Sequence, residues 1–208
     1  MTKTVDYIVI GAGSAGCVVA GRLAGQAGVS VLLLEAGPRD RNPWIHVPVG
    51  YAKMLESHTV NWQFPTEPDP ATDGRVHLWP RGKTLGGSSA INAMLYVRGN
   101  PGDYDGWAQM GLKGWGWSDV LPYFMRSEDQ ARGALKGHGV GGPMHVSDPT
   151  FEHPISDALM AAAENAGIPM TDDFNAGDQE GDGLYQLTIR DGRRVSAAKA
   201  YLDPADKA

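Results

Sequence analysis

The apolar positions of the first 35 residues form two short runs with a helix-like stretch between them. The runs are Val5 to Ile10 and Val29 to Leu34. The first run ends in a glycine-rich turn, which small and apolar residues follow from Cys17 to Ala24. Short apolar runs are typical of strands, and a run of small and apolar residues after a turn favours a helix. The pattern predicts a strand, a glycine turn, a helix and a second strand.

The segment from residue 37 to 81 has a different pattern. Its apolar positions keep no sustained period of 2 or 3.6, and seven prolines interrupt it. Long loops in compact domains are usually lids or cofactor covers. Aromatic residues give the segment apolar anchors, and ordinary packing is the preferred interpretation of each: Trp44, Tyr51, Trp62, Phe64 and Trp79. We expect a long loop that is packed down.

Shorter elements are expected further along the chain. Asp103 can cap a short helix that runs to Met110, and Ser118 can cap another that runs to about Glu128. An amphipathic helix is expected over 155–166, because apolar residues recur on one face and Gly167 follows its end. Tyr185, Leu187 and Ile189 alternate as in a strand, and the chain has no internal repeat.

The glycine turn has the spacing of a dinucleotide-binding motif. Gly11 permits the tight turn, Gly13 lets the backbone approach a pyrophosphate, and Gly16 lets the helix pack against the strand. The helix N-terminus offers donors and a positive dipole end to phosphates. Glu35 ends the second run, where an acid meets a ribose hydroxyl and disfavours a 2′-phosphate. Such turns also serve packing alone, and the motif does not separate FAD from NAD.

A second glycine motif lies in the stretch from Arg81 to Arg98. Gly86 and Gly87 would let the backbone contact a flat ring or a diphosphate, and Ser88 and Ser89 can cap a following helix. Asn92, one turn into that helix, carries an amide with a donor and an acceptor, which suits the uracil-like edge of a flavin. A local bond to the backbone is the alternative. Arg81 and Lys83 could meet phosphate or form a solvated surface pair.

Composition and charge restrict the classes of function. The chain has 208 residues, 42% of them hydrophobic, with 28 glycines and 14 prolines, which suits a globular protein with long ordered loops. A net charge of −6 argues against a nucleic-acid partner. The single cysteine, Cys17, excludes an internal disulfide; we expect a small buried filler, with a low-pKa thiol as the alternative. We expect no transmembrane segment, no signal peptide, no metal site and a cytoplasmic location.

These motifs resemble the glucose-methanol-choline (GMC) oxidoreductases, a family of FAD-dependent alcohol oxidases and dehydrogenases. The run from Gly82 to Asn92, with Tyr96, Gly99 and Asp105 after it, is similar to the first signature of the family. The stretch from Ser88 to Gly99 is most similar to the bacterial choline-dehydrogenase-like branch. Further segments also resemble the family: Asn61 to Thr66, Gly141 to Val146, Gly183 to Thr188, and Arg194 to Leu202.

The resemblance implies an α/β fold, α+β overall, with a Rossmann-like FAD-binding domain over 1–147 that includes the cofactor-covering loop 37–81. The beginning of a substrate-binding domain would follow over 148–208. It also implies the positions of the FAD contacts. The diphosphate would lie on Gly11, Gly13, Ser14, Ala15 and Gly16; the ribose on Glu35, next to Ala36; the rest of FAD, flavin included, on Arg81, Leu85, Gly86, Gly87, Ser88, Asn92, Ala93, Met94 and Leu95. Some relatives tether FAD through a histidine before the matching asparagine. Ile91 stands there in this chain, so we expect non-covalent FAD.

The resemblance also implies an alcohol substrate, with hydride passing to flavin N5 and a catalytic His/His or His/Asn pair near the C-terminus. None of the six histidines lies in such a segment, and each is expected to be an ordinary loop or surface residue. We therefore expect a fragment that is inactive alone, whose catalytic residues lie beyond Ala208. A non-catalytic remnant, a lyase and a photodecarboxylase are the alternatives. The alcohol and the electron acceptor stay open.

Overall fold

The chain forms two compact units in the computed structural model, which describes residues 4–205. One unit comprises the residues up to Met94 together with those from Asp191 onward, and the other comprises Leu95–Arg190. The domain boundary expected at residue 148 falls inside the second unit. The assignment of a cofactor domain over 1–147 and a substrate domain over 148–208 therefore stays a prediction. Residues 1–3 and 206–208 of these two ranges lie outside the described part of the chain.

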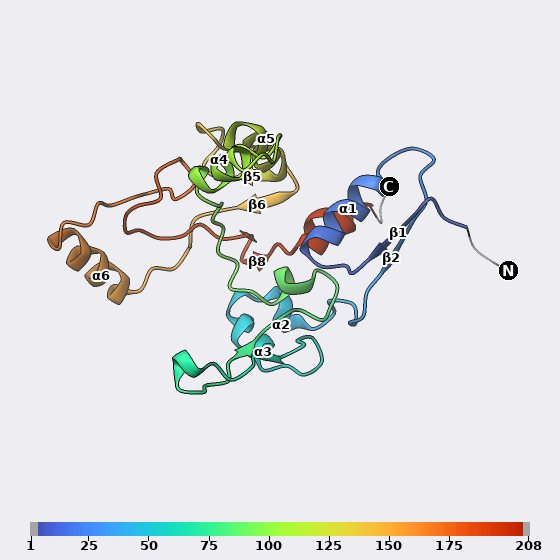
Figure 1. Ribbon diagram of the computed structural model, residues 1–208, viewed down its shortest axis with the longest axis horizontal. Coiled ribbons are helices and arrows are strands. Elements are labelled where there is room, and N and C mark those ends of the chain that lie inside the picture. The colour runs from blue at the N-terminus through green and yellow to red at the C-terminus, as the bar shows by residue number, and fades with distance from the viewer. Residues whose placement is uncertain (1–3, 206–208) are drawn as a thin grey trace. The chain divides into compact units, whose positions relative to one another are not determined.

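The first unit begins with the predicted strand, turn, helix and strand (Figure 1). Strand β1 (Tyr7–Ile10) pairs in parallel with β2 (Val31–Leu34), and helix α1 (Ser14–Ala24) connects them. Val9 of β1 and Val31 and Leu33 of β2 are partly buried, and α1 contributes the buried Cys17 and Ala20. The side chains of Ile8 and Ile10 stay exposed in the described part of the chain. Both faces of β1 carry apolar side chains, so its sequence is a continuous run of apolar residues and does not alternate between apolar and polar ones.

The 37–81 segment is packed down through short elements. These are α2 (Pro43–His46), η1 (Pro48–Gly50), α3 (Tyr51–Leu55), β3 (Phe64–Pro65), η2 (Pro70–Thr72) and β4 (Leu78–Trp79), with β3 and β4 antiparallel. A small core joins this segment to the second glycine motif, and its members are Ile45, Met54, Val60, Ala90 and Ile91. The unit is completed by η3 (Gly87–Ala90), β8 (Arg193–Arg194), η4 (Ala198–Leu202) and α7 (Asp203–Ala205).

The second unit contains the three expected helices, and two of them have caps other than those predicted. Its elements are α4 (Pro101–Gln109), α5 (Trp117–Ser127), β5 (Glu128–Gln130), β6 (Met144–Val146), α6 (Pro154–Asn165) and β7 (Ile189–Arg190), with β5 parallel to β6. Asn100 caps α4, because its side chain accepts from the Gly102 N–H, and Asp103 lies in the first turn instead. Gly116 precedes α5, and Asp119 accepts from its N–H. Asn100 and Gly116 occupy the N-cap positions, so Asp103 and Ser118 lie inside the helices that they were expected to cap.

The alternation over Tyr185 to Ile189 gives less strand than expected. Leu187 forms isolated bridges to Leu95 and to Ser147, and a strand begins only at Ile189. An alternation of apolar residues does not by itself give the segment a neighbouring strand, and a longer ladder of backbone hydrogen bonds needs one.

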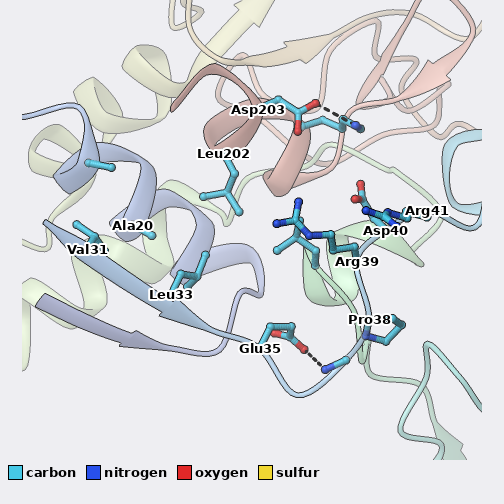
Figure 2. A pocket seen from close by; sticks show the side chains of 14 residues that line it. Ala20, Val31, Leu33, Glu35, Pro38, Arg39, Asp40, Arg41, Leu202 and Asp203 are labelled. Atoms are coloured by element: carbon cyan, nitrogen blue, oxygen red, sulfur yellow. Dashed lines mark hydrogen bonds and ion pairs between the residues drawn. The ribbon is translucent and has the colours of Figure 1, made fainter. Parts of the chain in front are cut away.

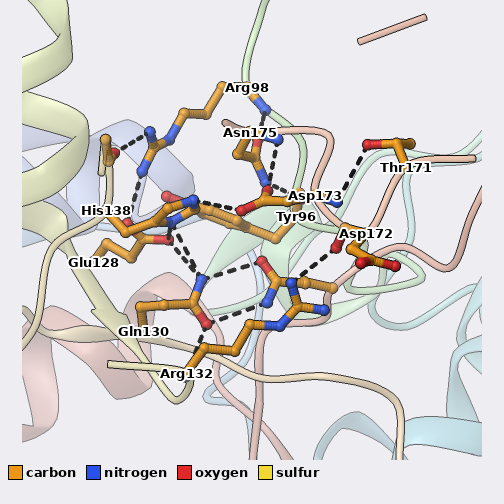
Figure 3. Close-up of polar contacts among 12 residues, drawn as sticks. Tyr96, Arg98, Glu128, Gln130, Arg132, His138, Thr171, Asp172, Asp173 and Asn175 are labelled. Carbon is orange, nitrogen blue, oxygen red and sulfur yellow. Dashed lines mark hydrogen bonds and ion pairs between the residues drawn. The ribbon is translucent and has the colours of Figure 1, made fainter. Parts of the chain in front are cut away.

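A network of polar contacts, largely buried, lies within the second unit (Figure 3). The carboxylate of Glu128, which is fully buried, accepts from Arg98 Nη2 at 2.7 Å and lies 2.9 Å from His138 Nδ1. The other ring nitrogen of His138 lies 2.8 Å from Asp173 Oδ2. The side-chain amide of Gln130 also reaches this site, with its Nε2 3.2 Å from Glu128 Oε1 and 3.3 Å from His138 Nδ1. The Arg98–Glu128 ion pair is therefore enclosed by further polar side chains.

The network corrects the expectation for His138. The side chain is 2% exposed and paired with two acids, so it is not an ordinary loop or surface histidine. Its partners lie 10 and 35 residues away along the chain, and folding alone brings them together.

Candidate cofactor site

The first glycine turn adopts the geometry that its spacing predicts. Gly11 has a φ of +92°, which glycine adopts without strain. A Cβ on Gly16 would lie 1.8 Å from the carbonyl oxygen of Gly11, so a side chain there would break the contact between helix and turn. Helix α1 begins directly after Gly13, with Ser14 and Ala15 exposed and no acidic residue in the first turn. This positive helix end can accept an anionic group.

Glu35 is anchored to the same turn. Its Oε1 accepts from the Gly37 N–H at 2.9 Å (Figure 2). Its Oε2 accepts from the Ala12 N–H at 2.8 Å. Each carboxylate oxygen can accept a further bond, so the predicted contact with a ribose hydroxyl is sterically and chemically open. The role of Glu35 toward a ribose stays a prediction.

The second glycine motif packs directly on the first. The Gly86 N–H donates to the Ala12 carbonyl at 2.8 Å. Gly87 has a φ of +55°, and a Cβ built on it would lie 2.6 Å from the Cα of Gly13. Two motifs about 70 residues apart in the sequence therefore form one surface of bare backbone.

A cavity of about 510 Å³ lies at this junction. Its walls include five predicted contacts, which are Glu35, Ala36 and three glycines from the two motifs. The lining residues are Ile10, Gly11, Gly13, Leu34, Glu35, Ala36, Trp62, Gly82 and Gly87. The cavity is concave and mostly apolar with one carboxylate, which is typical of a small-molecule site.

A second cavity, of about 520 Å³, lies on the α1 side of β2 (Figure 2). Leu85 lines it together with Ala20 and Leu33, and the Lys199–Asp203 ion pair stands at its rim. Glu35 lines both cavities. The predicted contact residue Leu85 therefore faces a different hollow from the one that Gly87 lines.

The helix expected after Ser88 and Ser89 is absent from the described structure. Only the 3-10 turn η3 forms, and the chain leaves the helical conformation at Ile91. The serine hydroxyls have other partners: Ser88 Oγ accepts from the Gly82 N–H, while Ser89 Oγ donates to the Gly86 carbonyl and accepts from the Ala197 N–H. The prediction of a serine-capped helix was wrong: the Ser88 hydroxyl holds the segment before the turn, and the Ser89 hydroxyl links the turn to Ala197.

Asn92 accordingly does not lie on a helix. Its Oδ1 accepts from the Met94 N–H at 3.1 Å, which is the local bond considered as the alternative. This Asx-type bond supports Met94, whose φ of +64° is unusual for a residue with a side chain. Arg194 Nη1 also donates to the same oxygen, at 2.8 Å.

The remaining predicted contacts are dispersed. Arg81 is exposed, donates to the Pro80 carbonyl and lies over the Trp79 ring, and it does not line either cavity. Ala93 is exposed, whereas Leu95 belongs to the second unit, where it pairs with Leu187. The structure therefore gathers the diphosphate and ribose positions, while the flavin-side assignments stay predictions.

Trp62 is a cavity residue that the sequence did not single out for binding. Its ring stacks on Phe64 with centroids 5.6 Å apart, and Lys83 Nζ lies 4.4 Å from its centre. The buried Asn61 before it holds the loop, because its Oδ1 accepts from the Arg81 N–H and the Gln63 N–H. The pair of Asn61 and Trp62 was the feature of the sequence from which this cavity residue could have been predicted.

Cys17 is the expected buried filler, and the alternative of a low-pKa thiol was wrong. Burial raises the pKa of the Cys17 thiol to about 11, and its Sγ lies 3.1 Å from the Ala12 carbonyl oxygen. The thiolate fraction at pH 8 is then on the order of one in a thousand. We expect native protein to react with a thiol reagent far more slowly than unfolded protein at that pH. Rapid native labelling would contradict this.

Comparison with known proteins identifies the architecture. A model of the GMC oxidoreductase family matches residues 5–208. The chain belongs to the GMC oxidoreductase family. It is 46% identical over 207 residues to human mitochondrial choline dehydrogenase, covering 96% of this chain and 35% of that protein. It is 47% identical over 198 residues to an alcohol dehydrogenase [acceptor] of Pseudomonas putida, covering 95% of this chain and 36% of that protein.

Two solved structures of oxidoreductases illustrate the structural similarity. Pyridoxine 4-oxidase from Mesorbium loti matches with a TM-score of 0.90 at 38% identity, covering 96% of this chain and 39% of that one. An FAD-dependent oxidoreductase from Chaetomium thermophilum matches with a TM-score of 0.88 at 31% identity, covering 98% and 37%. The chain thus spans little more than a third of the length of these proteins. No helix among residues 4–205 is long and apolar enough to cross a membrane.

Proposed function

We propose that this chain is the FAD-binding N-terminal part of an oxidoreductase that oxidises an alcohol. The observation that carries the proposal is the contact of two glycine motifs around the cavity that Glu35 lines. Relatives named as choline and alcohol dehydrogenases, together with an FAD-dependent structural neighbour, support the cofactor and the substrate class.

The residues present fit the cofactor. Gly87 contacts Gly13 so closely that a Cβ on Gly87 would lie 2.6 Å from Gly13 Cα, and the exposed N-terminus of α1 suits a diphosphate. Glu35, already fixed by two N–H donors, would hold ribose hydroxyls. Bound FAD would supply the acceptor for a hydride from the alcohol carbon. The residues of this chain would bind and orient it, because none of the six histidines matches the family's catalytic segment.

The direct test uses the full-length protein. We expect it to be yellow as purified and to lose its flavin absorbance when an alcohol is added without oxygen in the dark. The panel should include choline and simple primary alcohols, and reoxidation should be followed with oxygen and with a quinone. Absence of FAD, or no bleaching with any alcohol, would refute the proposal. A full-length native mass of 22.2 kDa would instead favour the non-catalytic remnant.

We further propose that FAD is held without a covalent bond. The tether position is Ile91, which has no nucleophile, and its side chain is 2% exposed within the core of Ile45, Met54, Val60 and Ala90. Acid precipitation should release the yellow colour into the supernatant. A yellow pellet would mean that another residue forms a bond to the cofactor.

A further inference from the structure

Arg194 is a buried cation whose hydrogen-bond partners are all neutral. The side chain is 3% exposed. Its Nε donates to the Ile45 carbonyl at 2.7 Å, and its Nη1 donates to the Ser89 carbonyl and to Asn92 Oδ1. No salt bridge involves Arg194 within the described residues, and its Nη2 is buried without a hydrogen-bond partner there. Burial lowers the pKa of Arg194 to about 10, so it remains charged at neutral pH.

A buried charge without a counter-charge is costly. An ion taken out of water costs several kcal/mol unless an opposite charge or a full set of acceptors offsets it. The three neutral oxygens around Arg194 satisfy part of its donors and leave its charge uncompensated. Such a site favours any negative charge that arrives nearby.

The same contacts determine what Asn92 can offer to a ligand. Its Oδ1 accepts from two N–H groups, Met94 N and Arg194 Nη1, which together use both lone pairs of the oxygen. Both neighbours are donors, so the oxygen must face them and the amide NH2 must face away. Asn92 itself is exposed. It therefore presents donors alone, whereas its sequence suggested a donor and an acceptor.

We propose that Arg194 is a positioning residue of the cofactor site, which fixes Asn92 as a donor and favours the reduced state of the bound group through its uncompensated charge. This inference rests on the proposed FAD site and goes beyond it. A hydride brings two electrons and one negative charge to its acceptor. A buried cation that is hydrogen-bonded to a contact residue stabilises that added charge. The aligned Asn92 N–H groups would point donors at the same growing charge.

The test measures the reduction equilibrium of FAD in the full-length protein, by equilibration with a reference dye. We expect Arg194→Met to lower the equilibrium constant for two-electron reduction about tenfold, which corresponds to about 30 mV. Arg194→Lys keeps the charge and loses the planar fork, so it should bind FAD more weakly than wild type while its reduction equilibrium stays nearer to wild type. Arg193→Met is the matched control, because Arg193 is the exposed neighbour and should change neither quantity.

A second variant covers the case in which Arg194→Met does not fold. Asn92→Asp retains both accepted hydrogen bonds and supplies a counter-charge to Arg194, so the apoprotein should melt at the same temperature or higher. FAD in this variant should be about tenfold harder to reduce, because the cation is neutralised and the amide donors are gone. An unchanged reduction equilibrium in Asn92→Asp, or in a folded Arg194→Met, overturns the inference. If the wild-type full-length protein does not bind FAD, the proposed function itself is refuted.

Discussion

Replacing Gly87 with alanine is expected to destabilise the full-length protein by about 2 to 5 kcal/mol and to abolish tight FAD binding. Two costs add at this position. The φ of +55° strains any residue with a Cβ, and the new methyl would lie 2.6 Å from Gly13 Cα, which cannot rotate away. The two glycine motifs would separate, and the cavity wall that they share would be lost. Urea denaturation and titration of the apoprotein with FAD measure the two effects.

Two other glycines separate these costs. Gly28 has a φ of +79° with open space around its Cβ position, so Gly28→Ala reports the backbone strain alone, about 1 to 2 kcal/mol. Gly106 lies in α4 with open space and no positive φ, and Gly106→Ala should be neutral or slightly stabilising. FAD affinity should survive both changes. A Gly87→Ala protein no less stable than Gly28→Ala, with native FAD affinity, would show that the motifs do not depend on this contact.

The part of the site that the sequence predicted correctly depends on local spacing. Strand, turn and helix succeed one another over residues 7–24, and Glu35 directly follows the paired strand. Each of these assignments follows from two local properties alone, the backbone conformations open to glycine and the spacing of apolar residues. The packing of Gly87 on Gly13 is harder to predict, because the two residues belong to distant segments. Each glycine motif can be recognised from its own spacing, but the spacing does not say that the two motifs touch.

The errors concern residues whose role is set by distant partners. Ser89 looked like a helix cap, yet its hydroxyl bonds to Ala197, 108 residues onward. Arg193 and Arg194 are adjacent and chemically identical, and only the fold buries one of them. Propensity and spacing carry no information about such pairings, so the interpretation of Asn92 could not include the guanidinium that fixes it.

Replacing Glu128 with glutamine is expected to cost about 3 to 5 kcal/mol in the free energy of unfolding, because it leaves the buried guanidinium of Arg98 without its acid. Glutamine has nearly the same shape, so no cavity forms and the loss reports charge. The amide also offers one acceptor where the Arg98 and Gly139 donors and the His138 ring now share two oxygens. Urea denaturation of the full-length protein, followed by the fluorescence of the tryptophans in this unit, measures the change.

Asp148→Asn is the matched control for the loss of an acid from an ion pair in the same unit. Asp148 pairs with Arg132 at 2.8 Å, but the two side chains are 47% and 30% exposed, so water screens the pair. The hydrogen bond from Arg132 lowers the pKa of Asp148, and we expect the substitution to cost about 1 kcal/mol or less. An equal cost for both substitutions would mean that burial does not strengthen the Glu128 contacts.

A double substitution tests whether uncompensated charge is the cause of the Glu128 effect. In Glu128→Gln with Arg98→Met, both members of the buried ion pair are replaced. Adding Arg98→Met to the glutamine variant should therefore cost much less than it costs the wild type, where it leaves the buried Glu128 carboxylate without its cation. Simple additivity of the two losses would place the energy in the individual hydrogen bonds, and uncompensated charge would then not be the cause of the Glu128 effect.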